Sequence, residues 1–364
     1  MKKNLLGWFA MATMLVGTGC SSDEVVNDYS PENAIQFGTY VGRDAQGRVT
    51  PLTTTNLTSF GVFAYYTDEG GIDNSKLLTK PNFMNNQEVT GSSATGWTYD
   101  PVKYWPNEAT DKLSFYAYAP YDSKNWTSGY INITIDGDVS NQTDYLYATP
   151  RIDMTKQKQT ENVLFEFHHA LSRIGFKVEA VIDDKNHQNN GAADADNENT
   201  GITAGTTISV QEVELLGNFY SEATLSLLDG TFGTKTGAAT SYQLLYNVNV
   251  GTSDFNNGNA ESVQVEKKQL NKDSEYMMLI PKKFEGTDLI RVRVKYTVTT
   301  EDTNLDGGKV SVENNIYSEP FAFEFLQGHA YDFVLHLGLQ SVKLSADVSG
   351  WTEHDVVVNV PINE

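Results

Sequence analysis

Apolar and polar residues alternate in short runs along most of this chain, which is the period of a β-strand that places one face on a core. In residues 113–119, Leu, Phe and Ala alternate with Ser and Tyr, and residues 59–66 form a second aromatic run. Before them, Ile35 and Phe37 alternate with polar residues and predict a first strand. The prolines within residues 97–106 cannot donate to a sheet, so this stretch is predicted to form turns and short edge strands. The aromatic side chains are predicted to be mostly core residues.

The second half of the chain shows the same alternation. Residues 163–178 make one of the most persistent strand patterns, and residues 291–298 place their charged side chains on one face. Phenylalanines alternate again in residues 321–325, and apolar residues do so in residues 331–337. Because turns rather than helices separate these runs, the chain is predicted to be all-β, with its strands packed as β-sandwiches. Residues 183–205 are rich in Asn, Asp, Gly and Ala and predict a long solvated loop.

Length and polar stretches predict the domain organisation. A chain of 364 residues suggests two domains rather than one. The polar stretch at 151–162 lies between two strand-rich regions and predicts the junction. We therefore expect a signal peptide at 1–19, a flexible tether at 20–33, an N-terminal β-sandwich at 34–162 and a C-terminal β-sandwich at 163–364.

The composition supports a folded β protein and narrows the class of partner. Apolar residues make up 39% of the chain, which argues against disorder. Asp and Glu outnumber Lys and Arg by 47 to 26, which gives a net charge of −21. So acidic a surface argues against a nucleic-acid partner and against electrostatic adhesion to anionic lipid.

The N-terminus predicts export with a lipid anchor. A short basic region at 1–3 precedes an apolar run at 5–17, which is too short for a stable membrane-spanning helix. Cys20, the single cysteine of the chain, follows small residues at the end of this run and resembles the acylated cysteine of a bacterial lipobox. Gly17 departs from that pattern, because leucine is usual three places before the cysteine. Acyl chains on Cys20 would hold the protein on a membrane, whereas the alternative is an ordinary secretory signal with an incidental cysteine.

Few residues suggest catalysis. None of the six histidines falls in a spaced metal-binding motif such as HExxH, and neither a GxSxG elbow nor a nucleotide-binding loop is present. His169 lies within a strand pattern and is predicted to be a core or interface histidine rather than a base. We therefore expect no enzymatic activity, no catalytic residue and no cofactor.

One stretch matches a metal-binding motif in form. Residues 302–313 fit the calcium loop of an EF-hand, from Asp302 to Glu313. The flanking segments have the pattern of strands rather than helices, and Lys309 stands where an apolar residue is usual. We interpret the stretch as a β-hairpin that turns at Asp306 and Gly307, so no metal site is expected, and calcium binding is the alternative.

Three segments resemble the fimbrillin family, which consists of lipoprotein precursors of type V pili and their accessory subunits. They are residues 99–106 (YDPVKYWP), 114–120 (SFYAYAP) and 169–178 (HALSRIGFKV), and the resemblance extends over residues 30–355. It implies two tandem transthyretin-like β-sandwich domains and export as a lipoprotein. It also implies assembly by strand exchange between subunits after an N-terminal piece is removed.

The resemblance also suggests where processing and assembly take place. In the family, proteolysis after an arginine early in the chain opens a groove that a strand from a neighbouring subunit fills. Arg43 and Arg48, in the loop at 42–56, are the candidate processing sites, and the alternative is that both are ordinary loop arginines. A strand at the C-terminus has to be either the closing strand of its own sandwich or the donor. Its alternating residues are Val356, Val358, Val360 and Ile362.

Together these features predict a pilus subunit, or an accessory or tip fimbrillin, that acts in adhesion. An unpaired apolar terminal strand invites aggregation, which favours self-closure and hence a tip or accessory subunit. The protein is expected at the outer membrane and in the fimbrium, lipid-anchored and surface-exposed. Its expected partners are other pilus subunits, the membrane through the N-terminal lipid, and a host or bacterial surface ligand. The alternative is a monomeric surface lipoprotein that binds glycans through exposed aromatic residues.

Overall fold

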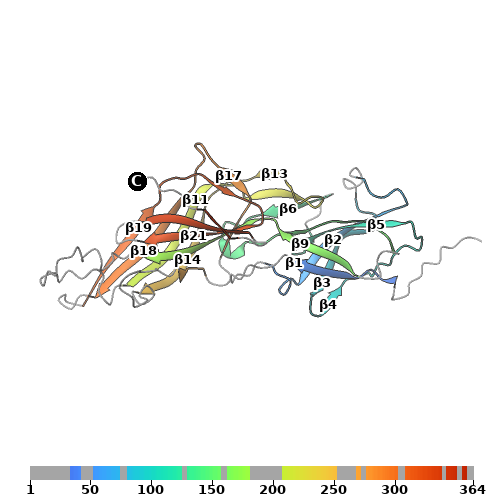
Figure 1. Ribbon diagram of the computed structural model, residues 1–364, viewed down its shortest axis with the longest axis horizontal. Helices are drawn as coiled ribbons and strands as arrows, with labels where there is room; N and C mark the ends of the chain where they lie inside the picture. Colours follow the sequence, from blue (N-terminus) through green and yellow to red (C-terminus); the bar gives the residue numbers. More distant parts are fainter. Residues whose placement is uncertain are drawn as a thin grey trace, which may run out of the picture.

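The structure is a computed structural model in which strands make up nearly all of the regular structure (Figure 1). The residues that it describes are 33–41, 52–73, 80–124, 129–156, 162–180, 207–251, 268–271, 276–301, 308–337, 342–350 and 355–358. Their strands form five sheets arranged along one long axis. The all-β class predicted from the alternation is confirmed.

An eight-stranded sheet occupies one end of the molecule. Its strands are β1 (Phe37–Val41), β2 (Ser59–Thr67), β3 (Met84–Ser92), β4 (Gly96–Thr98), β5 (Lys112–Ala119), β7 (Leu146–Ala148), β8 (Arg151–Met154) and β9 (Val163–His169). They pair in the order β1-β9-β7-β5-β2-β3-β4, with β8 beside β5. The inner face carries Phe60, Phe115 and Phe165, which are inaccessible to solvent. An isolated bridge between Ala34 and Tyr104 links the segment before β1 to the one before β5.

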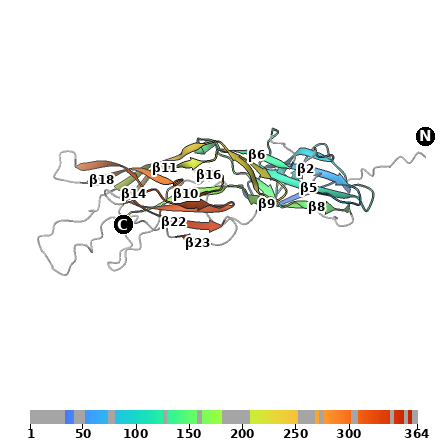
Figure 2. The same cartoon turned by 90° about the horizontal axis from the view of Figure 1, so that it is seen from above.

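Two further sheets occupy the other end. One contains β10 (Ser172–Ala180), β15 (Lys268–Gln269), β16 (Met277–Leu279), β21 (His329–Leu337), β22 (Val342–Gly350) and β23 (Asp355–Val358), in the order β15-β10-β21-β22-β23 with β16 beside β10. The other contains β11 (Thr207–Phe219), β14 (Ala239–Gly251), β18 (Arg291–Glu301) and β19 (Lys309–Tyr317), in the order β14-β11-β18-β19. Figure 2 shows them as two layers, and their apolar side chains share one core cluster. Packing of this kind is that of a β-sandwich.

Strand β18 confirms the alternation predicted for residues 291–298. Val294 is fully buried between the two sheets. Arg293 lies on the opposite face, where its guanidinium forms ion pairs with Glu212 and Glu214 of β11, and Nε lies 2.6 Å from Oε2 of Glu214. A strand with one face on the core and one in solvent therefore shows a clear period of two.

Strands β18 and β19 form an antiparallel hairpin. The pairing runs from Arg293 opposite Tyr317 to Glu301 opposite Lys309. The calcium-loop match at 302–313 therefore lies at the end of a hairpin, as predicted, and its residues 309–313 already belong to β19. Residues 302–307, which contain the predicted turn, lie outside the described residues.

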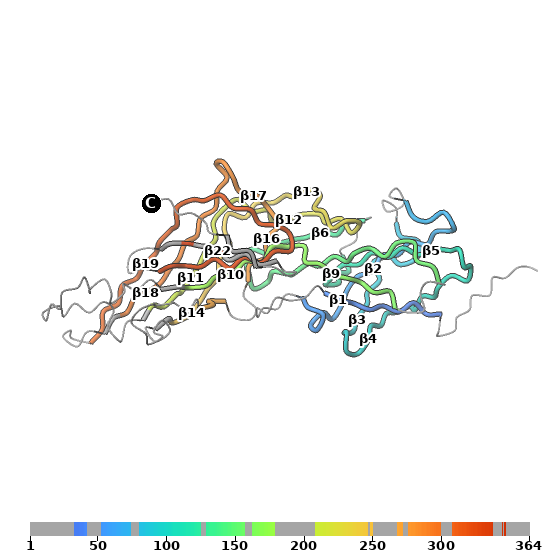
Figure 3. The backbone as a smooth tube through the Cα atoms, in the orientation of Figure 1, coloured from blue at the N-terminus to red at the C-terminus, as the bar shows by residue number. Residues whose placement is uncertain are grey.

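Short strands fill the middle of the molecule. A three-stranded sheet has the order β13 (Phe232–Thr236), β12 (Glu222–Ser226) and β6 (Tyr130–Thr134), and a smaller sheet joins β17 (Lys282–Phe284) to β20 (Phe323–Phe325). A 3-10 helix, η3 (Val139–Asn141), follows β6 and is capped by the side chain of Asp138. Figure 3 shows β6 beside β12, although β6 belongs to the first half of the chain and β12 to the second.

Strands β2 and β5 are buried on both faces. Phe60 and Phe115 point into the core of the eight-stranded sheet. On the opposite face, Tyr65, Tyr116 and Tyr118 belong to the larger core cluster, together with residues of β6, β10, β11 and β12. The expectation that residues 113–119 place only one face on a core is therefore wrong, because the middle sheet covers the second face.

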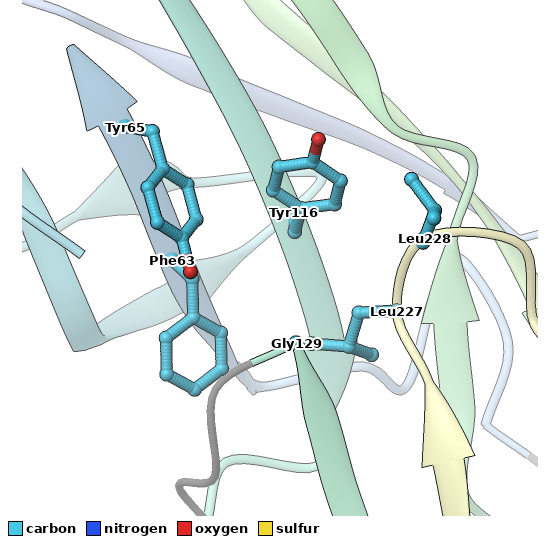
Figure 4. A pocket seen from close by; sticks show the side chains of 6 residues that line it. All are labelled: Phe63, Tyr65, Tyr116, Gly129, Leu227 and Leu228. Carbon is cyan, nitrogen blue, oxygen red and sulfur yellow. The ribbon is translucent and has the colours of Figure 1, made fainter. Parts of the chain in front are cut away.

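A small pocket lies on this second face (Figure 4). Its lining consists of Phe63, Tyr65, Tyr116, Gly129, Leu227 and Leu228. The hydroxyl of Tyr116 is buried without a hydrogen-bond partner among the described residues, and burial raises the pKa of Tyr116. The hydroxyl of Tyr118, on the same strand, donates to Oδ1 of Asn86 (2.7 Å) and also lies 2.8 Å from the carbonyl oxygen of Asp122. Both tyrosines are therefore buried, but among the described residues only the hydroxyl of Tyr118 has a hydrogen-bond partner.

The division into two tandem domains stays a prediction. The predicted junction at 162 and 163 falls immediately before β9, which pairs with β1 and β7 in the eight-stranded sheet. The next strand, β10, pairs with β21 in the six-stranded sheet, so sheet membership changes between His169 and Ser172. A division drawn by sheet membership alone would assign β9 to the first domain.

The two tyrosines give the first testable prediction. Tyr116→Phe removes a hydroxyl that has no partner among the described residues and should raise the free energy of unfolding by about 1 kcal/mol. Tyr118→Phe removes a bonded hydroxyl and should lower it by about the same amount. Urea unfolding of the two variants beside the wild type measures both changes. Equal changes for the two variants would contradict the assignment of a hydrogen bond to the hydroxyl of Tyr118 but not to that of Tyr116.

Candidate functional site

Strand β1 is held along one edge by a strand from a distant part of the chain. It pairs in parallel with β9, from Phe37 opposite Val163 to Val41 opposite Phe167. The backbone N–H of Val163 donates to the carbonyl oxygen of Gln36 over 2.7 Å. Parallel strands have no hairpin between them, so β1 gains this edge only when the fold is complete.

The other edge of β1 is also bound. The N–H of Ile35 donates to the carbonyl oxygen of Lys103 (2.9 Å), and the hydroxyl of Tyr99 donates to the carbonyl oxygen of Ile35 (2.8 Å). At the far end, Val41 donates its N–H to Oγ1 of Thr54 (3.0 Å). Strand β1 and the residues just before it therefore lie in a slot between β9 and the segment around Lys103. We call this slot the β1 groove.

The floor of the β1 groove is made of aromatic rings. The ring of Phe37 lies 5.6 Å from that of Phe165, 5.3 Å from that of Tyr99, 6.0 Å from that of Phe60 and 6.1 Å from that of Phe115, centroid to centroid. Phe37 is only 3% exposed. Burial of a side chain of this size contributes about 1.5–3 kcal/mol to folding, and the ring contacts add to it. Phe37 is thus the principal apolar anchor of β1.

The predicted processing and lipidation residues lie outside the described residues. Cys20 precedes β1 in the sequence, and Arg43 and Arg48 follow it in the segment 42–51 that leads from β1 to Leu52. A cut after either arginine would separate β1 from everything that follows. The connection that such a cut would break is the only covalent link between β1 and the rest of its sheet.

The candidate terminal strand is partly described. Strand β23 pairs antiparallel with β22, Val358 lying opposite Ala346 and Val356 opposite Val348. Strand β22 is in turn paired with β21 along its whole length. Val360 and Ile362 lie outside the described residues. The described part of the terminal strand therefore adds to a sheet of its own molecule.

His169 lies in the core, as its place in a strand pattern predicts. Its Nδ1 is 2.9 Å from Oδ2 of Asp144, and both side chains are almost completely buried. The same carboxylate accepts the N–H of Leu52 (2.9 Å). The histidine and the aspartate therefore tie the end of β9 to the residue that follows segment 42–51.

Other kinds of site find little support in the part of the chain that is described. Within it, no three His, Cys, Asp or Glu side chains are grouped as metal ligands would be. The same residues include no helix with the length and apolar character needed to cross a membrane. The large exposed aromatic residues there, Tyr40, Tyr66 and Tyr317, lie on three different strands of two sheets and form no common platform for a glycan.

Comparison with known proteins gives consistent results. The model of the fimbrillin-like family matches residues 47–351. The chain is 28% identical to a fimbrium subunit, Fim1C, of Phocaeicola vulgatus over 395 residues, which span 98% of this chain and 99% of that protein. Among solved structures, a fimbrial protein from Bacteroides vulgatus superposes with a TM-score of 0.61 at 22% identity, covering 88% of this chain and 100% of that one. A putative cell adhesion protein from Bacteroides ovatus gives a TM-score of 0.49 at 15% identity, covering 88% and 99%.

The anchoring role of Phe37 is testable in the intact chain. Phe37→Ala should lower the free energy of unfolding by about 3–5 kcal/mol, because it leaves a cavity among four rings. Tyr40→Ala is the matched control, since Tyr40 is on the same strand but 41% exposed, and it should change stability by less than about 0.5 kcal/mol. Chemical denaturation measures both. Similar losses in the two variants would contradict the role of Phe37 as the principal apolar anchor of β1.

Proposed function

The chain belongs to the fimbrillin-like family, and from this premise we propose that it is a fimbrial subunit that joins other subunits by strand exchange at the β1 groove. It is exported as a lipoprotein through Cys20 and reaches the outer membrane surface, where it takes part in adhesion as a component of the fimbrium. The observation that supports this most is the position of β1. The strand is seated in a bound, aromatic groove, yet a candidate processing segment follows it directly.

Cleavage changes the competition for the groove. While β1 is tied to the chain, its effective concentration at the groove is on the order of millimolar, and another strand rarely displaces it. After a cut at Arg43 or Arg48, β1 is held by non-covalent contacts alone and a departed strand is diluted into the surroundings. Cleavage therefore converts a closed subunit into one that accepts a strand.

Binding of another strand to the open groove is favourable for two reasons. Loss of β1 leaves the edge of β9 unpaired and exposes the rings of Phe60, Phe115 and Phe165. An extended segment of another subunit pairs with the edge and covers the rings at the same time, which is the physical basis of binding by strand addition.

The C-terminal strands support a tip or accessory role rather than a repeating one. A repeating subunit both accepts and donates a strand, whereas β22 here is paired with β21 along its whole length and carries the buried residues Leu344 and Ala346. Withdrawal of β22 would uncover the core between the two sheets. The terminal strand with Val356, Val358, Val360 and Ile362 serves in this proposal as the closing edge of its own sheet.

Processing is tested with arginine variants. An arginine-specific protease should cut the exported wild-type chain after Arg43 or Arg48, and the product should join fimbriae. Arg43→Ala with Arg48→Ala should stay intact and be absent from fimbriae, while Arg151→Ala, outside the segment, should behave as the wild type. N-terminal mass spectrometry and immunogold electron microscopy provide the two readouts. Normal assembly of the uncut double variant would exclude cleavage as the trigger.

The lipid anchor is tested separately. Cys20→Ala should abolish acylation and move the protein out of the membrane fraction, because Cys20 is the single cysteine of the chain. Ser21→Ala is the control and should remain in the membrane fraction. Metabolic labelling with a fatty acid followed by detergent partitioning distinguishes the two. A labelled Cys20→Ala variant would refute the assignment.

A further inference from the structure

We propose that the strand which replaces β1 comes from a different polypeptide and carries a large apolar side chain at the position of Phe37 and a β-branched apolar side chain at the position of Thr39. This inference rests on the strand exchange proposed above and adds the kind of partner. It follows from the shape and polarity of the β1 groove, for which β1 itself is the template.

The position of Phe37 calls for a large side chain. Four rings surround Phe37, and its own ring is the only group of β1 that fills the space among them. A smaller side chain leaves an unfilled volume, which close-packed interiors tolerate poorly. At the next residue, Gly38, a side chain would begin 3.3 Å from Cδ1 of Leu164, so a small residue is favoured there.

The position of Thr39 calls for an apolar residue instead of the one present. Thr39 faces the core side of the sheet, opposite Phe165. Its Oγ1 is buried and has no hydrogen-bond partner among the described residues. A buried hydroxyl without a partner destabilises the state that contains it, and valine has nearly the same shape without the hydroxyl. A strand with valine or isoleucine at this position therefore binds the groove more tightly than β1 does.

The terminal segment of this chain fits the groove poorly in the parallel orientation of β1. With Val358 in the place of Phe37, the space among the rings is only partly filled. Pro361 then takes the place of Tyr40. Because the carbonyl of Gln36 faces β9 and every second residue of a parallel strand faces the same neighbour, the Tyr40 position also faces β9, where proline has no N–H to donate.

Other registers of this segment bury a polar group. Moving it two residues in one direction places His354 in the position of Ile35, which is only 1% exposed. Moving it two residues in the other direction places Glu364 in the position of Val41, which is only 3% exposed. Burial of a charged side chain without a partner is strongly unfavourable. A second copy of this chain is therefore a poor source of the replacing strand through its terminal segment.

The sequence of β22 matches the β1 groove better than the terminal segment does, but β22 is already part of the six-stranded sheet of its own molecule. With Leu344 in the place of Phe37, Ser345 takes that of Gly38 and Ala346 that of Thr39. Leu344 and Ala346 are already buried in the core of their own molecule, and β22 is paired with β21 throughout. Neither C-terminal segment of a second copy therefore suits the groove, which supports a strand from another polypeptide as its occupant.

A competition assay on the full chain tests the inference. The chain is nicked within residues 42–51, so that β1 stays seated, and synthetic peptides compete with a fluorescent peptide of residues 33–41. The Thr39→Val peptide should bind about tenfold more tightly than the native one, and the Phe37→Ala peptide at least about a hundredfold more weakly. The peptide of residues 355–364 should bind more weakly than the native peptide.

The outcomes separate the two proposals. If no peptide binds, including the native one, strand exchange itself is wrong. If the native peptide binds but the peptide of residues 355–364 equals it, the terminal segment of a second copy can supply the replacing strand and this inference is wrong. Equal affinities of the native, Thr39→Val and Phe37→Ala peptides would also overturn it.

A second measurement avoids any dependence on the nicked form. In the intact chain, Thr39→Val should raise the melting temperature by about 2 °C. Thr54→Val is the matched control and should lower it, because Oγ1 of Thr54 accepts the N–H of Val41 (3.0 Å) and donates to its carbonyl oxygen (3.2 Å). A lower melting temperature for Thr39→Val would show that its hydroxyl is bonded and would overturn the argument for that position.

Discussion

The burial of β2 and β5 on both faces is the constraint on which the rest of the molecule depends. One face supplies Phe60 and Phe115 to the floor of the β1 groove. The other face supplies Tyr65, Tyr116 and Tyr118 to the core shared with the middle sheet and the two sheets beyond it. Packing on this second face therefore holds the two strands in place independently of β1. In the proposed strand exchange, β1 would leave one face of this pair while the opposite face keeps the two ends of the molecule together.

The local patterns could be predicted from the sequence, but the long-range pairings could not. Alternation correctly predicted the strand that contains Val294 and Arg293, because one of its faces meets solvent. It was wrong for Tyr116 and Tyr118, since aromatic residues on both faces do not reveal that a second layer covers them. The parallel pairing of β1 with β9 and the antiparallel pairing of β6 with β12 join segments far apart in the chain and have no local signal. Pairings of this type depend on the completed fold.

The candidate site shows the same division. The spacing of Ile35 and Phe37 predicted a strand with one buried face, which the groove confirms. The candidate roles of Arg43, Arg48 and Cys20 came from a resemblance and from position in the chain, and these residues lie outside the described part. The sequence contained no sign that the hydroxyl of Thr39 lacks a partner, because that depends on the surroundings that β9 provides. The sequence therefore predicted the strand that lies in the groove, but not which side chains the groove would favour at each position.

Charge sets a further condition on assembly. A net charge of −21 makes copies of this chain repel one another, and screening at physiological ionic strength limits that repulsion to separations within about 8 Å. In the proposed assembly, a partner that is also acidic would have to approach more closely than this before its strand enters the groove, so the screened repulsion would oppose the last step of the encounter and apolar burial would have to drive it. Aromatic rings and an unpaired strand edge suit that purpose, because neither depends on charge. In the proposed exchange, specificity would arise from the fit of side chains to the groove, at positions such as those of Phe37 and Thr39, rather than from attraction at a distance.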